Sequence, residues 1–305
     1  MENIVRVRKR ESYPRKSLLR EIARHWQEYL CIAPFFILFA VFFAFPIVWS
    51  FILSFQRWDG IGDPQWVGLK NYDFMLHDST TQKALSNTVI FLVLLLPLEL
   101  ILPLVFGVLL NQPFLKFRGL FRTLIFLPVV TSGVIVGIVF KFFFGSEYGW
   151  LNSALGTFGM GPFPWLKAEG WAFIPVITLV VWGRVGYTTL IVLGGLQSMD
   201  HQVYEAARID GASGWQSFWR ITLPLMRPVM TFILITSTIA IISLFGQPYV
   251  LTKGGPSNST LTPLLQIYNI GFGGRIGDAA ALSFVLTLIM IVVALVQFRL
   301  SRAHE

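Results

Sequence analysis

The sequence is poor in charged residues and almost free of cysteine. Only 13% of its 305 residues are Asp, Glu, Lys or Arg, whereas a soluble domain carries about 25%. This shortage excludes an ordinary soluble globular protein. The single cysteine, Cys31, excludes a disulfide within the chain. The four histidines are scattered, without the i, i+4 or CxxC-type spacing of a metal site, so we expect no bound metal ion.

A phosphate-binding loop is missing as well. Lys16 is the only lysine followed by serine or threonine, and no GxxxxGK pattern precedes it. Such a loop cradles ATP phosphates through its backbone N–H groups. The chain therefore cannot hold ATP phosphates in such a loop, and any energy from ATP would have to come from another chain.

Apolar residues make up 54% of the chain and gather in long runs. A helix that crosses a bilayer needs about 20 mostly apolar residues. Six stretches approach or exceed this length, four without a charge and two with one charge each. They cover residues 29–56, 84–110, 123–140, 171–195, 228–252 and 279–298. We therefore predict an all-α integral membrane protein with six transmembrane helices.

The basic residues predict how these helices are oriented. Cytoplasmic loops of membrane proteins are enriched in Lys and Arg. With the N-terminus inside, 16 of the 24 basic residues fall on the cytoplasmic side and 7 on the outer side. We expect cytoplasmic N- and C-termini, with a basic tail at 1–28, a first transmembrane helix at 29–56 and a five-helix core at 84–300. The net charge of +8 then reflects topology, and we expect no nucleic-acid partner.

One predicted cytoplasmic loop, residues 196–224, carries a specific pattern. It reads E-A-A-x3-G-x9-I-x-L-P from Glu205 to Pro224, with L-Q-S before it and T-K-G-G-P after the next apolar stretch. This spacing resembles the cytoplasmic loop of the inner-membrane permease subunits of binding-protein-dependent ABC importers, in their sugar-importing branch.

The resemblance implies the type I permease fold and a coupling role for the loop. In that family the loop contacts the ATPases and passes their motion to the membrane helices. The residues to which the resemblance assigns coupling are Glu205, Ala206, Ala207, Asp210, Gly211, Ile221, Leu223 and Pro224. It also implies no catalytic residues and no cofactor in this chain.

The resemblance also implies partners and a location. The partners would be a second homologous permease subunit, expected to form a heterodimer with this chain, and two cytoplasmic ABC ATPases that bind ATP and Mg²⁺. An extracytoplasmic solute-binding protein would deliver the solute. The chain is expected in the inner or plasma membrane of a prokaryote, in contact with lipid.

The loop residues predict local structure by themselves. Asp200 can cap a short helix, and Gly211 can supply the left-handed turn that ends it. Pro224 marks where a second short helix must end or bend. An amphipathic hairpin resting on lipid head groups is the alternative interpretation, and the complete spacing favours the protein interface.

Two charges fall inside predicted transmembrane helices. Glu99 and Arg184 each cost about 2.5–3.5 kcal/mol at the bilayer centre on insertion scales, so each should face protein or water. Both lie about 16 Å from the predicted cytoplasmic ends of their helices. They can form an ion pair inside the bundle, or one of them can face the translocation route.

Polar residues on the fifth predicted helix complete the expected substrate path. Ser243, Phe245 and Gln247 combine hydroxyl, aromatic and amide groups that suit the face of a sugar, and we place them on the path with Arg184 and Glu99. The sequence thus predicts a permease subunit of an ATP-driven importer that carries a sugar or sugar-like solute into the cytoplasm.

Two other classes of function were weighed against the importer. An ion-coupled secondary transporter or channel would have similar helices. An intramembrane serine protease is suggested by Gly211-Ala212-Ser213-Gly214, which fits GxSG, but no predicted transmembrane helix holds a histidine that could act as base.

Overall fold

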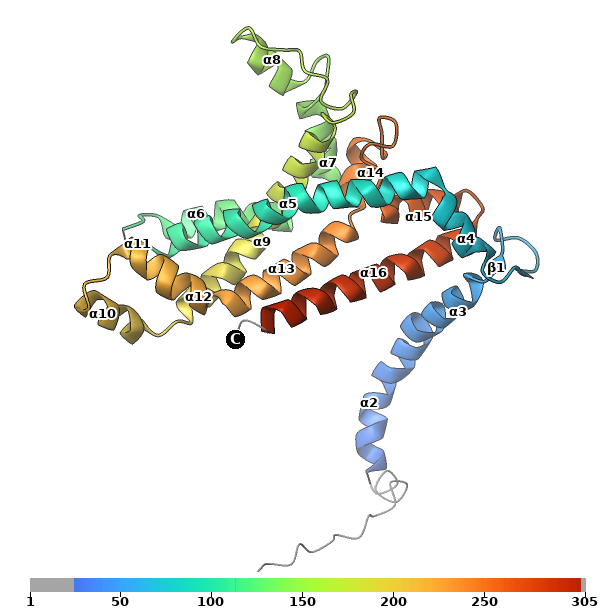
Figure 1. The fold of residues 1–305 in the computed structure, drawn as a ribbon, viewed down its shortest axis with the longest axis horizontal. Helices are drawn as coiled ribbons and strands as arrows, with labels where there is room; N and C mark the ends of the chain where they lie inside the picture. The colour runs from blue at the N-terminus through green and yellow to red at the C-terminus, as the bar shows by residue number, and fades with distance from the viewer. Residues whose placement is uncertain (1–24, 113, 303–305) are drawn as a thin grey trace, which may run out of the picture. The chain divides into compact units, whose positions relative to one another are not determined.

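The computed structural model describes residues 25–112 and 114–302, so most of the predicted basic tail lies outside the described residues. The chain divides into two compact units, residues 1–52 and 53–305, which are described separately (Figure 1). In the first unit, α2 (Trp26–Phe39) continues through a π-helical turn, η1 (Ala40–Ala44), into α3 (Phe45–Leu53). No side chain of α2 or η1 is buried within the chain, as expected of a helix that meets lipid or another protein.

The second unit contains a short hairpin and the remaining helices. In the hairpin β1 (Gln56–Arg57) pairs with β2 (Gln65–Trp66) in antiparallel register. The helices that follow are α4 (Lys70–His77), α5 (Ser79–Asn111), α6 (Arg118–Phe126), the 3₁₀ turn η2 (Leu127–Val130), α7 (Gly133–Phe143), α8 (Trp150–Gly156), α9 (Phe173–Gln197), α10 (His201–Ile209), α11 (Gly214–Ser217), the π-helical turn η3 (Phe218–Thr222), α12 (Leu223–Leu225), α13 (Arg227–Ile242), α14 (Gly246–Leu251), α15 (Pro263–Phe272) and α16 (Ile276–Arg302).

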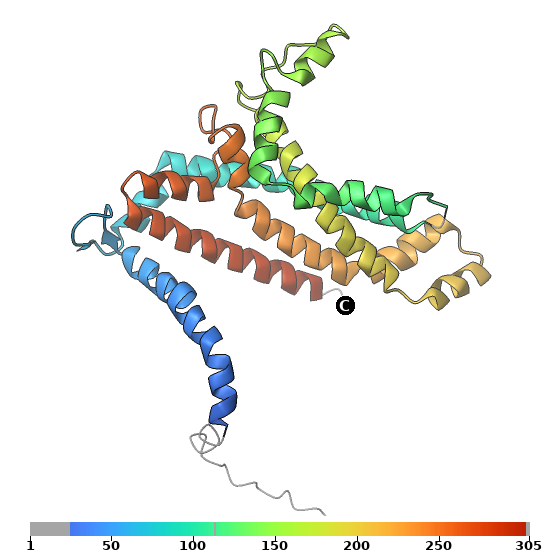
Figure 2. The same cartoon turned by 180° about the vertical axis from the view of Figure 1, so that it is seen from behind.

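The long helices of the second unit form a bundle. Helix α13 packs between α5 and α16, while α9 makes its most extensive contact with α5 (Figures 1 and 2). Helices α10 and α11 lie at one end of the bundle, and α4, α15 and β1 lie at the other. The predicted cytoplasmic loop at 196–224 and the segments around α4 and α15, predicted to be outside, therefore lie at opposite ends, while α8 projects away from the bundle.

Five of the six predicted transmembrane helices are present in the described residues as helices long and apolar enough to cross a membrane. They cover Trp26–Leu53, Ser79–Asn111, Phe173–Gln197, Arg227–Leu251 and Ile276–Ser301. Many large apolar side chains on them are exposed, for example Phe35, Val93 and Leu288. A soluble protein rarely exposes so much contiguous apolar surface, whereas lipid favours it.

The stretch predicted as a single helix at 123–140 is instead broken, and that prediction was wrong in this respect. Helices α6 and α7 meet at an angle of 98° across η2. Pro128 lacks a backbone N–H and cannot continue an α-helical ladder. Thr131 and Ser132 then adopt extended backbone, and the Thr131 hydroxyl donates to the Pro128 carbonyl at 2.6 Å.

The stretch predicted at 228–252 is also interrupted, at residues 243–245 between α13 and α14. Pro248 explains the position of the break. It has no N–H to offer the carbonyl of Leu244, four residues earlier, and its ring crowds that carbonyl. The Thr262 hydroxyl donates to the Leu244 oxygen at 2.5 Å instead. The backbone group released by the break is thereby satisfied, as a low-dielectric interior requires.

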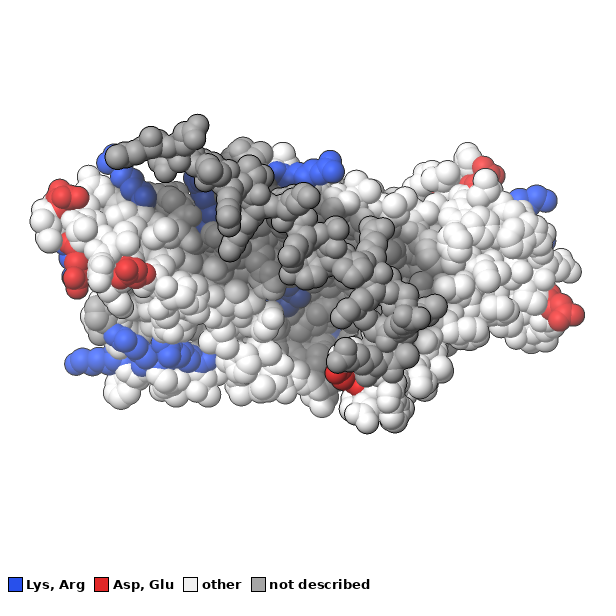
Figure 3. Space-filling view, turned by 90° about the horizontal axis from the view of Figure 1, so that it is seen from below, with Lys and Arg blue, Asp and Glu red and all other residues white. Residues whose placement is uncertain are grey.

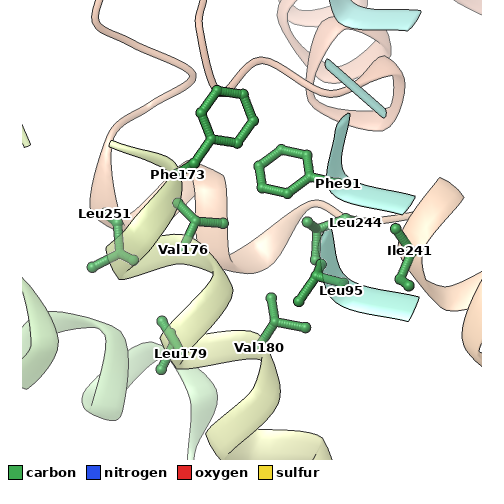
Figure 4. Packing of buried hydrophobic residues seen from close by; sticks show 9 residues of the cluster. All are labelled: Phe91, Leu95, Phe173, Val176, Leu179, Val180, Ile241, Leu244 and Leu251. Atoms are coloured by element: carbon green, nitrogen blue, oxygen red, sulfur yellow. The ribbon is translucent and has the colours of Figure 1, made fainter. Parts of the chain in front are cut away.

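The apolar core lies where α5, α9, α13 and α14 meet (Figure 4). Phe91 of α5 contacts Phe173 of α9 with ring centroids 4.9 Å apart. The residues of this core are Phe91, Leu95, Phe173, Val176, Leu179, Val180, Ile241, Leu244 and Leu251. Ile241 lies just before the break in the fifth stretch and Leu244 lies within it, so packing holds the break in place.

Small residues allow the helices to approach closely. A Cβ atom added to Gly186 of α9 would lie 2.2 Å from the backbone oxygen of Ile125 in α6. A Cβ added to Gly183, one turn earlier in α9, would meet nothing within 4 Å. The contact between α6 and α9 therefore depends on the missing side chain at 186, in the manner of small-residue packing in membranes.

We predict that Gly186→Ala destabilises the protein by about 1–3 kcal/mol, because a backbone oxygen cannot move aside as a flexible side chain would. The matched Gly183→Ala should be neutral or stabilising by up to about 1 kcal/mol, since alanine favours a helix over glycine. Thermal unfolding of the detergent-purified variants measures both. Equal effects of the two substitutions would contradict the close approach at Gly186.

Candidate functional site

A cavity of about 170 Å³ lies beside the break between α13 and α14. Helices α5 and α9 provide its other walls. All five residues predicted for the substrate path line it, and the remaining lining residues are small or apolar. The five are Glu99, Arg184, Ser243, Phe245 and Gln247. The fold thus brings together side chains that are far apart in the sequence.

The two intramembrane charges form an ion pair in this cavity. Arg184 Nε donates to Glu99 Oε1 at 2.7 Å. The Glu99 side chain is 2% exposed and that of Arg184 is 32% exposed, so the carboxylate is the more deeply buried partner. The two interpretations made from the sequence are therefore compatible, because the residues pair with each other and also line the cavity. Removing one partner of a buried pair costs about 3–5 kcal/mol, since the other charge is left uncompensated.

The pair leaves part of its hydrogen-bonding capacity unused. The Glu99 Oε2 atom is buried and has no hydrogen-bond partner in the described part of the chain. The remaining guanidinium N–H groups of Arg184 can still donate, because only Nε is engaged with Glu99.

The uncharged polar residues of the cavity come from the break and from the first turn of α14. The Ser243 hydroxyl donates to the Ile239 carbonyl at 2.7 Å, which leaves its lone pairs free to accept. Among residues 25–112 and 114–302, the amide of Gln247 has no hydrogen-bond partner. An uninterrupted helix would not present this combination of groups to one cavity.

Phe245 begins a row of aromatic rings that leads away from the cavity. Its ring stacks on Tyr249 at 5.3 Å, and Tyr249 contacts Tyr268 at 5.4 Å. Tyr268 in turn contacts Phe272 at 4.5 Å, and Phe272 is 81% exposed at the end of α15. A hydrogen bond with Tyr249 raises the pKa of the Tyr268 hydroxyl. The row connects the cavity with the end of the bundle predicted to be outside.

The predicted coupling loop forms a helical hairpin. The Asp200 carboxylate caps α10 by accepting from Gln202 N at 2.9 Å. At the other end, Gly211 N donates to the Arg208 carbonyl and Ala212 N to the Ala207 carbonyl. These two bonds form a Schellman motif, which requires a left-handed residue at its centre. Gly211 supplies it with φ of +78°.

One face of α10 is anchored and the other is free. The Tyr204 hydroxyl lies 3.0 Å from the Thr222 hydroxyl and 3.0 Å from Met199 Sδ, which fixes α10 against η3. Ala207 is buried on the same side. The exposed side chains of α10 include those of Glu205 and Ala206, with Asp210 exposed at the end of the helix. Figure 3 shows acidic and basic side chains together at this end of the molecule.

The second helix of the hairpin runs further than predicted. It begins at a capping box between Ser213 and Gln216 and continues through η3 and α12 to Leu225. Pro224 was predicted to mark where this helix ends or bends, and the helix ends one residue later, at Leu225. The wider π-helical turn before Pro224 accommodates its ring, with Leu223 N donating to the Phe218 carbonyl. Ile221, Leu223 and Pro224 are half-buried between loop and bundle.

Three residues of the hairpin were missed by reasoning from the sequence. Tyr204 and Thr222 hold the two helices together across 18 positions, and neither residue carries a local signal of this contact. Ile209 is 87% exposed at the end of α10. A large apolar residue in the last turn of a short polar helix was a signal that could have identified it as part of a contact surface.

Comparisons with known proteins agree with this geometry. Residues 103–305 match the family described as "Binding-protein-dependent transport system inner membrane component". The lactose transport system permease protein LacF of Rhizobium radiobacter is 38% identical over 91% of this chain and 94% of its own length. A solved bacterial ABC transporter for import of the acidic polysaccharide alginate has a chain with TM-score 0.85 at 24% identity, covering 94% of this chain and 99% of that one.

A second structure of a bacterial alginate ABC transporter, in complex with an alginate pentasaccharide-bound periplasmic protein, gives a TM-score of 0.82 at 23% identity, covering 94% of this chain and 98% of that chain. These structural matches establish the type I permease fold, and the family match confirms the resemblance seen in the loop. The chain therefore belongs to the binding-protein-dependent transport system inner membrane component family, as a multi-pass, non-catalytic permease subunit.

Proposed function

We propose that this chain is one of two permease subunits of an ATP-driven importer, and that it carries a sugar or sugar-like solute through the cavity beside Arg184 into the cytoplasm. Family membership and the sugar named for LacF support this proposal and favour it over the alternative of an ion-coupled secondary transporter or channel.

The observation that carries the proposal is the continuity between the hairpin and the cavity. Helix α9 holds Arg184 and leads directly into α10, while α12 leads into α13, which ends at Ile242, directly before Ser243. The distance along each helix is about 20–25 Å at 1.5 Å per residue. Met226, fully buried, packs near Val192 and Ile233 and joins the two helices beside the hairpin. A displacement of the hairpin therefore moves two walls of the cavity together.

This arrangement supports alternating access. Binding of ATP to the partner ATPases would close their dimer and move α10 with them. Because Tyr204 links α10 to Thr222, the hairpin moves as one body instead of bending at Gly211. Helices α9 and α13 then shift relative to α5, so the lining of the cavity changes its exposure from one side of the membrane to the other.

The proposal includes specific partners. Two cytoplasmic ABC ATPases would bind ATP and Mg²⁺, a second, different permease would complete the translocation path, and an extracytoplasmic binding protein would deliver the solute. The exposed Glu205, Ala206 and Ile209 suit the ATPase contact. Ala206 permits close approach of another backbone, and Ile209 offers an apolar anchor.

Purification of the tagged chain from native membranes tests the proposal. We expect a second permease and an ATPase with a phosphate-binding loop to co-purify, and the reconstituted complex to hydrolyse ATP faster when a sugar-loaded binding protein is added. Solute uptake by this chain without any ATPase, driven by an ion gradient, would refute the importer.

We predict that Gly211→Val uncouples the complex. Valine at a φ of +78° costs about 1–2 kcal/mol and disrupts the Schellman motif that ends α10. Stimulated ATP hydrolysis and transport should fall at least about tenfold, while membrane insertion stays intact. Vesicle transport and phosphate-release assays measure the two activities.

Gly214→Ala provides the matched control. A Cβ at Gly214, as at Gly211, meets nothing within 4 Å, but Gly214 has no positive φ. ATP hydrolysis by the complex with Gly214→Ala should stay within about twofold of the wild type. Gly211→Asn should retain part of the activity, because asparagine tolerates the left-handed region. If Gly211→Val transports normally, the coupling role of the loop is wrong.

A further inference from the structure

We propose that the ion pair makes the cavity selective for uncharged sugars over anionic ones such as uronates, aldonates and sugar phosphates. The inference rests on the proposed function, because it assumes that the solute passes this cavity. It adds the charge class of the solute, which family membership leaves open. Lactose, named for one relative, is uncharged, and alginate, named for the solved transporter, is acidic.

The charge of the cavity is balanced within the cavity itself. Glu99 and Arg184 are the only ionisable residues among its described lining residues, and they pair at 2.7 Å. With both charged, their charges sum to zero. A free arginine at this position would instead attract anions strongly, because the apolar walls screen charge poorly.

The geometry of the pair opposes an anionic solute. The Arg184 side chain is 32% exposed, while the Glu99 side chain is 2% exposed and its carboxylate accepts from Arg184 Nε. A solute carboxylate or phosphate that approached Arg184 would compete with a partner already in place. It would also lie close to the buried negative charge of Glu99, and like charges brought together across a contact are strongly unfavourable.

The groups that remain available fit hydroxyls. Arg184 retains N–H donors, Gln247 offers an amide donor and acceptor, and Ser243 offers acceptor lone pairs. The Phe245 ring adds an apolar face of the kind that the C–H face of a sugar covers. A sugar hydroxyl both donates and accepts, so it can satisfy these groups without bringing a charge.

The volume limits how much of the solute this chain holds. The cavity of about 170 Å³ is smaller than the roughly 300–1,000 Å³ of pockets that enclose drug-sized ligands. It therefore provides one part of a site, and the second permease would supply the rest. The selectivity argued here applies to the part of the solute that meets Arg184.

Lactose and its aldonic acid, lactobionate, differ by one negative charge and by the opened ring of the oxidised glucose unit, and uncharged lactitol, which has the same open chain as lactobionate, controls for the ring. Equilibrium dialysis with the radiolabelled sugars measures their binding to the assembled permease–ATPase complex without its binding protein, so that only the membrane cavity selects. We expect the wild type to bind lactose at least about tenfold more tightly. Equal binding, or tighter binding of lactobionate, overturns the inference and leaves the proposed function standing. Binding of neither sugar argues against the sugar cavity of the proposed function.

Variants of the pair identify the cause of the preference. Glu99→Gln leaves Arg184 unbalanced, and the ratio of lactose to lactobionate affinity should fall at least about tenfold. Glu99→Gln/Arg184→Gln removes both charges and should restore the preference for lactose, even if the single variant fails to assemble. Glu147→Gln removes a carboxylate paired with Lys167 outside the cavity and should leave the ratio unchanged. A ratio that stays constant in both Glu99 variants would refute the role of the pair.

Discussion

The ion pair between Glu99 and Arg184 constrains how the bundle can be arranged. Neither charge is tolerated alone in an apolar interior, so α5 and α9 must align at the depth where the two side chains meet. These two helices make the most extensive contact in the second unit. The packing of Phe91 on Phe173 and the cavity that the pair lines are both arranged around this alignment. A slip of one helical turn would separate the charges and the aromatic contact together.

The low dielectric of the apolar interior also limits where the helices can break. A break releases backbone groups that water cannot reach, so each needs a substitute partner. The Thr262 hydroxyl satisfies the Leu244 carbonyl, which Pro248 cannot serve, and the Pro128 carbonyl accepts from both the backbone N–H and the hydroxyl of Thr131. The break at residues 243–245 allows neighbouring side chains of one short segment, Ser243 and Phe245, to line the cavity together. Breaks in membrane helices are common at solute sites, where the interrupted backbone lines a cavity, and elsewhere they are tolerated where the backbone is buried in protein.

Some of this structure was predictable from the sequence because its signals were either local motifs or long apolar runs. Apolar runs located five membrane helices, and the spacing from Glu205 to Pro224 identified the hairpin and the residue that ends α10. The equal depth of Glu99 and Arg184 indicated that they could pair. The 98° bend after Pro128 was not predictable, because a proline in a membrane helix can kink it slightly or end it. Pro97 and Pro103 lie within the continuous α5. The contact of Tyr204 with Thr222 depends on how two helices fold back, which no local pattern encodes.

The hairpin and the cavity make opposite demands on the chain. Force is transmitted only by a stiff element, and the hairpin is stiffened by Asp200, the Schellman motif and the capping box at Ser213. The cavity must instead change shape, and it is lined by the break at 243–245, where no regular ladder resists movement. Helices α9 and α13 connect the stiff hairpin to the cavity, which can change shape. Motion is therefore expected to concentrate at the break, beside the polar groups that line the cavity.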